Sequence, residues 1–303
     1  MHIPDSMLHG CVCPVTAVVS AIGIAAAAYY GMKGEKPSAF RFAAITALIF
    51  AGQMMNFPIR NGTSGHLLGG VLAASLLGTP FGVLSIAMVV VIQSLVFSDG
   101  GVTVLGANLL NMAIIGAGLG GMLRSTLAAR WQGHRGEILA TAVAAWVSVV
   151  LASFAVSVEL AIDGQIVFSS VIVAMVVTHA LIRIGESIIT AAACLLVPSN
   201  DAVKSQYGHV VIPLMAATVI ALLLSPFASG FPDGLEWVAE KYQFLHESAP
   251  AFVGSLPDYT VPFISNEMLS TGLSGLIGVI ISFVAAWALH GFISLFVEQQ
   301  QNA

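Results

Sequence analysis

Charged side chains are scarce in this sequence. Ten Lys and Arg and fifteen Asp and Glu make up only 8% of its 303 residues, whereas 57% are hydrophobic and the mean hydropathy is +0.94. A soluble globular protein carries about 25% charged residues. The shortage excludes an ordinary water-soluble fold and predicts a membrane protein, whose helices satisfy their own backbone hydrogen bonds. The net charge of −5 says little about partners, and no nucleic-acid partner is expected.

Several signals are missing as well. The chain has no G-x-x-x-x-G-K-[ST] nucleotide loop and no H-E-x-x-H motif, so we expect a transporter subunit that is no enzyme and hydrolyses no ATP. Its three cysteines, Cys11, Cys13 and Cys194, do not form a complete metal site by their spacing. The first ten residues contain no Lys or Arg, unlike a secretory signal peptide. Met1 is therefore expected to be the mature amino terminus.

The apolar residues fall into nine segments, and a membrane-spanning helix needs roughly 20 residues. The segments run approximately over 14–32, 42–57, 66–79, 81–97, 104–123, 138–158, 166–196, 210–229 and 270–296. The third is short for a full span, and Gly185 is a candidate break or bend in the seventh. The predicted fold is an all-α, polytopic transmembrane bundle of about seven helices followed by a two-helix hairpin.

Basic residues predict the orientation of this bundle. If every segment crosses the membrane, seven of the ten lie on one side: Lys33, Lys36, Arg41, Arg124, Arg130, Arg135 and Lys204. Cytoplasmic loops carry the excess of Lys and Arg, so that side is inside. The expectation is a multi-pass protein of a bacterial-type inner membrane, with its N-terminus extracytoplasmic and its C-terminus cytoplasmic.

The amino terminus reads Met1-His2-Ile3-Pro4-Asp5. A His at position two offers a metal ion three nitrogens: the terminal amine, the His2 amide and the His2 imidazole. These donors close fused chelate rings in one plane, a geometry that favours Ni(II) or Cu(II), with Co(II) also accepted, over Mg, Ca or Mn. A frayed terminus without function is the alternative for this motif taken alone.

A second candidate element is the Gly-rich stretch 56–70, which contains Ser64 and His66 and lies on the same side of the membrane as the N-terminus. Irregular backbone at membrane depth requires burial in protein or a cavity. His66 can supply a fourth nitrogen to the plane begun by His2, although a packing His is the alternative. Asp5 is expected to orient one of the imidazoles, as metal-bound His usually requires. His9 is a weaker candidate ligand.

Two further groups of polar residues lie within the apolar segments. Asn108 and Asn111 share a helix face and either support the metal loop or join helices by hydrogen bonds. His179, Arg183 and Glu186 also share one face. Counting from residue 166 at 1.5 Å per residue places His179 roughly 20 Å deep, too deep for an outer metal site. This face is either an internal Arg183–Glu186 ion pair or a coupling surface, formed by His179 and Glu186, toward the cytoplasm.

These residues resemble a known family. Met1–Asp5, the stretch around His66, residues 100–111 and residues 179–191 are similar to the CbiM/NikM family, the substrate-binding membrane components of energy-coupling factor transporters for cobalt and nickel. Pro232-Asp233-Gly234-Leu235-Glu236 resembles the PDGLE element of the CbiN/NikN-type small subunit. The resemblance implies two domains, residues 1–205 for metal binding and residues 206–303 for a PDGLE-type two-helix unit with an extracytoplasmic loop.

The resemblance also implies the ligands and the partners. The metal would be held by the Met1 amine, the His2 amide and imidazole nitrogens and the His66 imidazole, with no cofactor beyond the transported Co²⁺ or Ni²⁺. The partners would be a transmembrane coupling subunit and cytoplasmic ATP-binding subunits, and the small-subunit part would help load metal or hold the assembly. Ser6 stands where the family usually has Gly, and Arg183 where it usually has a small residue.

The predicted function is therefore metal capture for an ATP-driven uptake system. A self-sufficient secondary carrier is one alternative, and an intramembrane enzyme using His179, Arg183 and Glu186 is another. Cobalt and nickel both accept nitrogen donors, so the sequence does not decide which of the two metals is transported. Genomic neighbours, such as genes for urease, hydrogenase or corrinoid (cobalamin) synthesis, would decide between the two.

Overall fold

The computed structural model describes residues 2–5, 7–59, 62–166, 168–196, 208–244 and 250–301. Its helices and strands follow one another along the chain as α1 (Val12–Lys33), α2 (Ala39–Gln53), β1 (Asn56–Pro58), β2 (Ser64–His66), α3 (Gly70–Leu77), α4 (Thr79–Ile92), the π-helical η2 (Gln93–Phe97), α5 (Leu105–Asn108), the π-helical η3 (Leu109–Leu119), α6 (Gly120–Arg130), α7 (His134–Ile162) and α8 (Phe168–Leu196). The C-terminal part adds α9 (Gly208–Val219), η4 (Ile220–Leu224), η5 (Ser225–Phe227), α10 (Gly234–Lys241), η6 (Pro257–Tyr259) and α11 (Glu267–Gln301). The predicted all-α bundle is confirmed.

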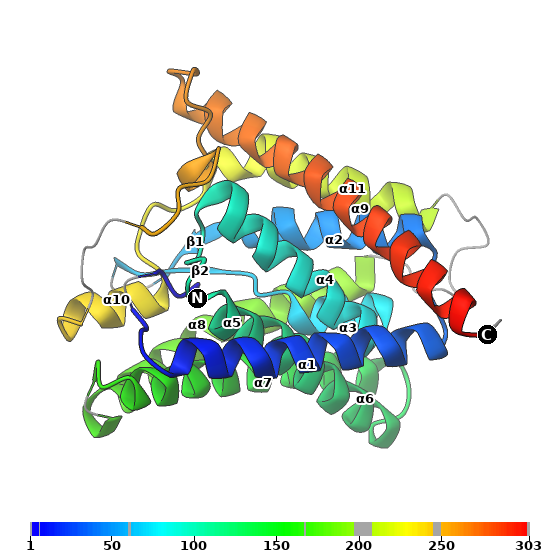
Figure 1. Ribbon diagram of the computed structural model, residues 1–303, viewed down its shortest axis with the longest axis horizontal. Coiled ribbons are helices and arrows are strands. Elements are labelled where there is room, and N and C mark those ends of the chain that lie inside the picture. The colour runs from blue at the N-terminus through cyan, green and yellow to red at the C-terminus, as the bar shows by residue number, and fades with distance from the viewer. Residues whose placement is uncertain are drawn as a thin grey trace.

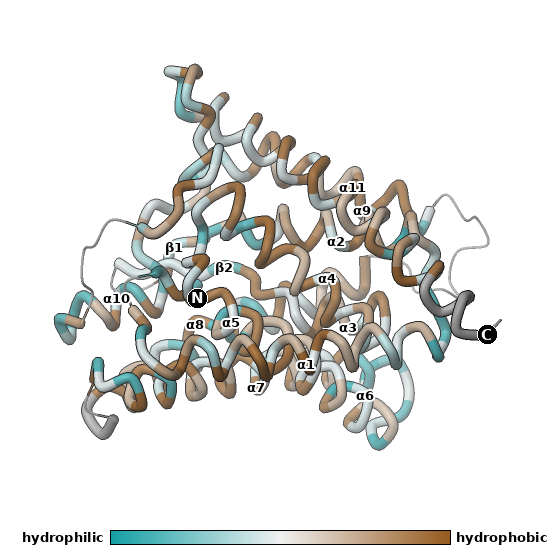
Figure 2. Tube along the Cα trace, in the orientation of Figure 1, coloured by the Kyte–Doolittle hydropathy of each residue, from teal (hydrophilic) through white to brown (hydrophobic). Residues whose placement is uncertain are grey.

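Seven helical stretches in the described residues are long and apolar enough to cross a membrane. They are Val12–Lys33, Thr79–Phe97, Leu105–Arg130, His134–Ile162, Val171–Leu196, Gly208–Phe227 and Glu267–Leu295. The long helices run side by side in Figure 1, and Figure 2 shows hydrophobic residues along them and hydrophilic residues gathered near their ends. Helix α2, with 15 residues, is shorter and almost completely buried.

The third predicted segment, 66–79, is not one helix. Its first residue closes β2, and a regular helix, α3, covers only Gly70–Leu77. Gly69 adopts φ +72°, a left-handed conformation that glycine accepts readily and that turns the chain into α3. By contrast, α8 continues through Gly185, so this glycine does not interrupt the seventh segment.

Strands β1 and β2 form a small antiparallel hairpin at one end of the bundle (Figure 1). Asn56 pairs with His66, Phe57 with Gly65 and Pro58 with Ser64. The residues of β2 are all buried. Non-helical backbone is tolerated in a membrane protein only when protein encloses it or it lines a cavity, and the hairpin meets this condition.

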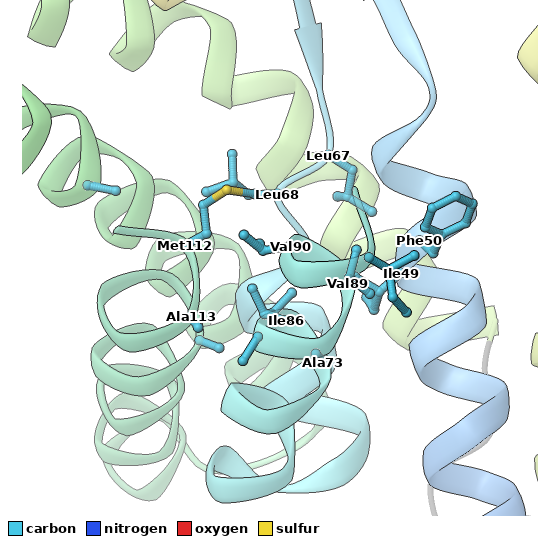
Figure 3. Close-up of a cluster of buried hydrophobic side chains, with 14 of the residues drawn as sticks. Ile49, Phe50, Leu67, Leu68, Ala73, Ile86, Val89, Val90, Met112 and Ala113 are labelled. Atoms are coloured by element: carbon cyan, nitrogen blue, oxygen red, sulfur yellow. The ribbon is translucent and has the colours of Figure 1, made fainter. Parts of the chain in front are cut away.

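The core lies directly behind the hairpin. Leu67 and Leu68, which follow His66, insert between α2, α4 and η3 (Figure 3). Their neighbours in that view are Ile49, Phe50, Ala73, Ile86, Val89, Val90, Met112 and Ala113. Because these side chains are packed from several helices, the position of the residue before them is determined by the core.

The two C-terminal helices α9 and α11 lie against α2 (Figure 1). Gly278 of α11 faces Phe50, since an added Cβ would lie 2.0 Å from the Phe50 Cζ. Near the other end of α2, Phe40 lies beside Phe283 and Trp287 with ring centroids 6.4 and 6.5 Å apart. The predicted C-terminal hairpin therefore packs onto the bundle. The domain boundary predicted at residue 205 lies outside the described residues.

Gly70 provides a test of this packing. A Cβ at this position would lie 2.5 Å from the carbonyl carbon of Gly116 and 2.7 Å from the Ala117 nitrogen. Gly70→Ala is expected to lower the free energy of unfolding by about 1–3 kcal/mol, because two backbones must separate. Thermal unfolding in detergent measures the effect. Gly291→Ala in α11 is the control, because an added Cβ there would have no other atom within 4 Å. Equal melting temperatures of the two variants would contradict the packing described.

Candidate metal centre

The first described residues lie in a groove lined by other parts of the chain. Asn108 holds the backbone of Ile3 from both sides: its Oδ1 accepts from the Ile3 N–H at 2.8 Å, and its Nδ2 donates to the Ile3 carbonyl at 3.0 Å. The Gly101 N–H donates to the same carbonyl at 2.9 Å. Asn108 and the Ile3 side chain are fully buried. These bonds fix the backbone directly after His2.

Among the described residues, Asp5 bonds to Thr103 and Ala251 and to no imidazole. Its Oδ1 accepts from the Thr103 N–H at 2.9 Å and from the Thr103 hydroxyl at 2.7 Å. Its Oδ2 accepts from the Ala251 N–H at 3.1 Å. The Asp5 carboxylate thus holds the turn after residue 101 and the C-terminal loop together, and its expected role in orienting a metal-bound histidine stays a prediction.

Asp99 is the carboxylate that contacts His2. The His2 Nδ1 lies 3.0 Å from the Asp99 Oδ1, and the His2 Nε2 lies 3.1 Å from the Gln93 Oε1. Tyr259 closes a ring of contacts, since its hydroxyl donates to the Asp99 Oδ2 at 2.5 Å and accepts from the Gln93 Nε2 at 3.1 Å. The Tyr259 ring stacks on Phe97 with centroids 4.8 Å apart. The orientation of His2 therefore depends on η2 and on the C-terminal loop.

His66 lies beside His2. The two imidazole rings are stacked, with centroids 5.5 Å apart and an interplanar angle of 14°. The His66 Nδ1 lies 3.2 Å from the Leu67 carbonyl, and its Nε2 lies 3.8 Å from the Asp233 Oδ2. Only 5% of the His66 side chain is exposed. Two imidazoles from segments far apart in the sequence thus meet in a nearly closed space.

Burial sets the protonation of this group of residues. It lowers the pKa of the His66 imidazole to about 3, which leaves a nitrogen lone pair available for a metal ion at neutral pH. Burial acts to raise the pKa of Asp99, but the attraction and hydrogen bond of His2, with the bond from Tyr259, hold that pKa below its usual range. Burial and the neighbouring Asp99 raise the pKa of Tyr259 well above its usual value, so the phenol keeps the proton that it donates.

Helix α8 holds the loop that carries His66. Arg183 donates from Nη1 to the His66 carbonyl at 2.5 Å and to the Glu186 Oε2 at 2.8 Å. The Glu186 Oε1 accepts from the N–H groups of Leu68 and Gly69 at 2.9 and 3.2 Å. The sequence-based estimate of depth placed the face with His179, Arg183 and Glu186 too far inside the membrane to meet the His66 region. This estimate is wrong, because the hairpin enters the bundle and meets α8. The Arg183–Glu186 ion pair expected as one alternative is present.

His179 and Glu186, expected as a coupling surface, are both buried within the chain. The His179 Nδ1 lies 2.8 Å from the Met175 carbonyl, and its Nε2 faces the start of α10. In this structure neither side chain is on an outer surface, since the C-terminal part and the His66 loop cover them.

The remaining residues that the sequence predicted to support the metal loop have other contacts in the structure. The Ser64 hydroxyl donates to the Phe231 carbonyl at 2.8 Å, so it joins the hairpin to the PDGLE element. Asn111 donates to the buried Glu159 of α7 at 2.8 Å and does not reach the metal loop, which corresponds to the helix-joining alternative. His9 is exposed and its N–H donates to Asp163. Met1 and Ser6 lie outside the described residues.

A cavity of about 640 Å³ opens beside the two histidines. Its lining includes His2, His66, Asp99, Asp233 and Tyr259. Among the described residues, no three His, Cys, Asp or Glu side chains are arranged to hold a metal ion by themselves. A metal ion at this position would therefore need donors other than these side chains, such as backbone groups.

Sequence reasoning missed four residues that surround the histidines: Gln93, Asp99, Asp233 and Tyr259. Asp99 directly precedes the stretch 100–111, and Asp233 lies in the PDGLE element; both segments carry the family resemblance. The two segments could have been searched for the carboxylate partner that metal-bound histidines usually have. Gln93 and Tyr259 carry no local signal, because only the fold brings them to His2.

Comparison with known proteins identifies the family of this chain. The model of the CbiM family, described as a cobalt uptake substrate-specific transmembrane region, matches residues 2–201. This chain belongs to the CbiM family. The model of the PDGLE domain matches residues 208–294, so the chain joins a CbiM region to a PDGLE domain. It is thus a member of a cobalt and nickel transport family and a membrane protein.

Relatives combine the same two parts. A protein of Archaeoglobus fulgidus, provisionally named as a fused nickel transport protein NikMN, is 32% identical over 95% of this chain and 98% of its own length. The fused nickel transport protein NikMN of Rhodobacter capsulatus is 28% identical over 92% of this chain and 94% of its own. A crystal structure of a truncated transition metal transporter covers 64% of this chain and 97% of its own, with a TM-score of 0.57 and 28% identity.

The bonds between Asn108 and Ile3 lead to a prediction for this centre. Asn108→Ala leaves the buried Ile3 N–H without its partner and removes one of the two hydrogen bonds to the Ile3 carbonyl, at a cost of about 1–3 kcal/mol. Because the segment carrying His2 is then held less firmly, affinity for Co²⁺ or Ni²⁺ is expected to fall about 10-fold to 100-fold, as measured by equilibrium titration of the purified chain. Asn266→Ala, at an exposed position directly before α11, serves as the control. Equal affinities in both variants would contradict the role assigned to Asn108.

Proposed function

We propose that this chain is the substrate-capture component of an ATP-driven uptake system for Co²⁺ or Ni²⁺. The observation that carries the proposal is the meeting of His2 and His66, whose rings stack 5.5 Å apart beside a cavity. Both rings are enclosed, with 8% of the His2 side chain and 5% of the His66 side chain exposed. Imidazole nitrogen is a donor that suits Ni(II), and an ion in this space would be reached from two segments that lie far apart in the sequence.

In the proposed complex, four nitrogens hold the ion: the Met1 amine, the amide and imidazole nitrogens of His2, and the imidazole of His66. Nitrogen donors in one plane suit Ni(II), and imidazoles are accepted by cobalt as well. The His2 Nδ1, which would close the chelate ring, lies against Asp99 at 3.0 Å. Binding therefore requires His2 to turn from Asp99 toward the ion while Asn108 keeps the following peptide in place.

The site is proposed to open to the outside of the cell. His2, the hairpin and α10 gather at one end of the bundle, and the C-terminus lies at the other (Figure 1). Basic residues concentrate at the end opposite to the site, where Lys33 closes α1, Arg130 closes α6 and Arg135 begins α7. The excess of positive charge faces the cytoplasm in membrane proteins. The amino terminus would then be extracytoplasmic and the carboxyl terminus cytoplasmic.

Energy for transport would come from other chains. The sequence has no nucleotide-binding loop, so cytoplasmic ATP-binding subunits would hydrolyse ATP and a transmembrane coupling subunit would transmit the change. Helix α1 exposes Val15, Val18 and Ile22 along its length, a surface suited to lipid or to such a membrane partner.

The first test replaces His66. His66→Ala is expected to abolish saturable Co²⁺ and Ni²⁺ binding to the purified chain and metal accumulation by cells that express the full transporter, because one of the four nitrogens is lost. The matched control is His9→Ala, an exposed histidine at the same end of the chain that should leave both unchanged. Binding retained by the His66 variant would refute the proposed site. Uptake that survives deletion of the partner ATPases would instead identify a self-sufficient carrier.

The second test changes only the amino terminus. A short Gly-Ser extension before Met1 keeps every side chain but removes the free amine from the position that the chelate needs. We expect metal binding to fall at least as far as it does in Asn108→Ala, measured by the same titration. The same extension at the C-terminus is the control, and unchanged binding with the N-terminal extension would show that the amine is not a ligand.

A further inference from the structure

Tyr259 joins Asp99 and Gln93, the two residues that hold the His2 ring, and its hydroxyl has a single hydrogen to donate. Because a carboxylate only accepts, the hydroxyl gives this hydrogen to the Asp99 Oδ2 at 2.5 Å and accepts from the Gln93 Nε2 at 3.1 Å. The Gln93 amide then presents its Oε1 to the His2 Nε2, which lies 3.1 Å away. An amide oxygen only accepts, so the His2 Nε2 carries a hydrogen and donates it.

The hydrogen on Nε2 leaves the other nitrogen of His2 for a metal ion. In the proposed chelate, the ion is bound by the His2 Nδ1 together with the His2 amide and the Met1 amine, and the Nε2 takes no part. The bond from Nε2 to Gln93 is therefore compatible with the loaded site, where the ion replaces Asp99 at Nδ1. Metal-bound histidines usually donate their second N–H to a nearby acceptor, which fixes the tautomer and the ring orientation. Gln93 is such an acceptor for His2.

The Tyr259 side chain is itself held firmly against the segment that carries Gln93. Its ring stacks on Phe97 with centroids 4.8 Å apart and an interplanar angle of 19°. Before it in the chain, the Leu256 N–H donates to the Val96 carbonyl at 2.9 Å. Phe97 and Val96 both belong to η2, which begins at Gln93. The phenol and the amide are thus kept beside each other by the same short helix.

The backbone at this tyrosine is strained. Asp258 and Tyr259 have φ angles of +51° and +54°, in the left-handed region that residues other than glycine rarely adopt. Such strain persists only where the surrounding structure imposes it, and it is concentrated at ligand sites and switch regions. A loop that merely connected two helices would not need it. Here the strained turn brings the Tyr259 hydroxyl within reach of both Asp99 and Gln93.

We propose that Tyr259 is a positioning residue for metal binding: it orients the Gln93 amide, which keeps a hydrogen on the His2 Nε2 and reserves the His2 Nδ1 for the ion. The inference rests on the proposed function. Tyr259 belongs to the PDGLE region, whereas Gln93 and His2 belong to the CbiM region, so one part of the chain selects the tautomer of a ligand in the other.

Loss of the phenol hydroxyl has a defined chemical consequence. The Gln93 amide is then free to turn over and to place its NH₂ group against the His2 Nε2. Facing a donor, this nitrogen accepts, and the ring hydrogen moves to Nδ1. A nitrogen that carries a hydrogen has no lone pair for a metal ion, so this tautomer cannot close the chelate ring.

Tyr259→Phe tests this role in the full chain, because Phe keeps the ring on Phe97 and removes only the hydroxyl. We expect affinity for Ni²⁺ and Co²⁺, measured by equilibrium titration, to fall about 10-fold to 100-fold, as is typical when the groups that orient a metal-bound histidine are disturbed. Tyr242→Phe is the matched control, since it makes the same change at an exposed position of the same domain and should keep the parent affinity. Parent affinity in Tyr259→Phe would overturn the inference.

A rescue experiment separates orientation of the amide from packing. In Gln93→Glu the side chain presents an accepting oxygen whichever way it turns, so the Tyr259 hydroxyl is no longer needed to orient it. We expect Gln93→Glu to raise the affinity of the Tyr259→Phe chain by about 10-fold and that of the parent by a clearly smaller factor. Equal factors in the two chains would show that the hydroxyl does not act through Gln93 and would reject the proposed role. Thermal melting of the metal-free chains verifies that each variant is folded.

His66→Ala distinguishes this inference from the proposed function. Saturable binding should be absent in His66→Ala, and weakened but still saturable in Tyr259→Phe. Binding lost in His66→Ala but unchanged in Tyr259→Phe rejects only the positioning role, whereas binding retained in His66→Ala rejects the proposed metal site itself.

Discussion

A loop of irregular backbone inside an apolar helical bundle has to find partners for its N–H and C=O groups, and here a buried ion pair supplies them. Arg183 binds the His66 carbonyl, and Glu186 binds the N–H groups of Leu68 and Gly69. Each charge neutralises the other at 2.8 Å and meets a backbone dipole as well. Removing either partner would leave a buried charge uncompensated, which is strongly unfavourable. The position of His66 depends on this pair.

The amino-terminal segment is held in a comparable way, by hydrogen bonds to polar groups in and around the turn before α5. Asn108 and the Gly101 N–H fix Ile3, and the Asp5 carboxylate binds Thr103. Each half of the centre is therefore held by its own scaffold, the His66 loop by α8 and the amino-terminal segment by the residues around the start of α5. Such support sets the orientation of the histidines more tightly than the short segments could by themselves.

The PDGLE domain takes part in the centre through contacts that do not depend on any bound ion. Tyr259 binds both residues that hold His2, and the Asp233 segment is tied to Ser64. Fusion of the two parts in one chain keeps these contacts at high effective concentration, since the second part cannot diffuse away. Residues of this domain therefore line the same cavity as His2 and His66.

The amino-acid sequence by itself determined the membrane class and the long apolar helices, and it singled out His2 and His66 as candidate ligands, because hydropathy and donor chemistry are local properties. It could not place α8 beside the hairpin or assign Asp5 its partner, since both depend on how far the loop after β1 enters the bundle. The pairing of Asp99 with His2 and the approach of Asp233 to His66 were decided only by the tertiary structure. Packing brings these residues together from distant segments, and no local pattern encodes a distance between side chains on different helices.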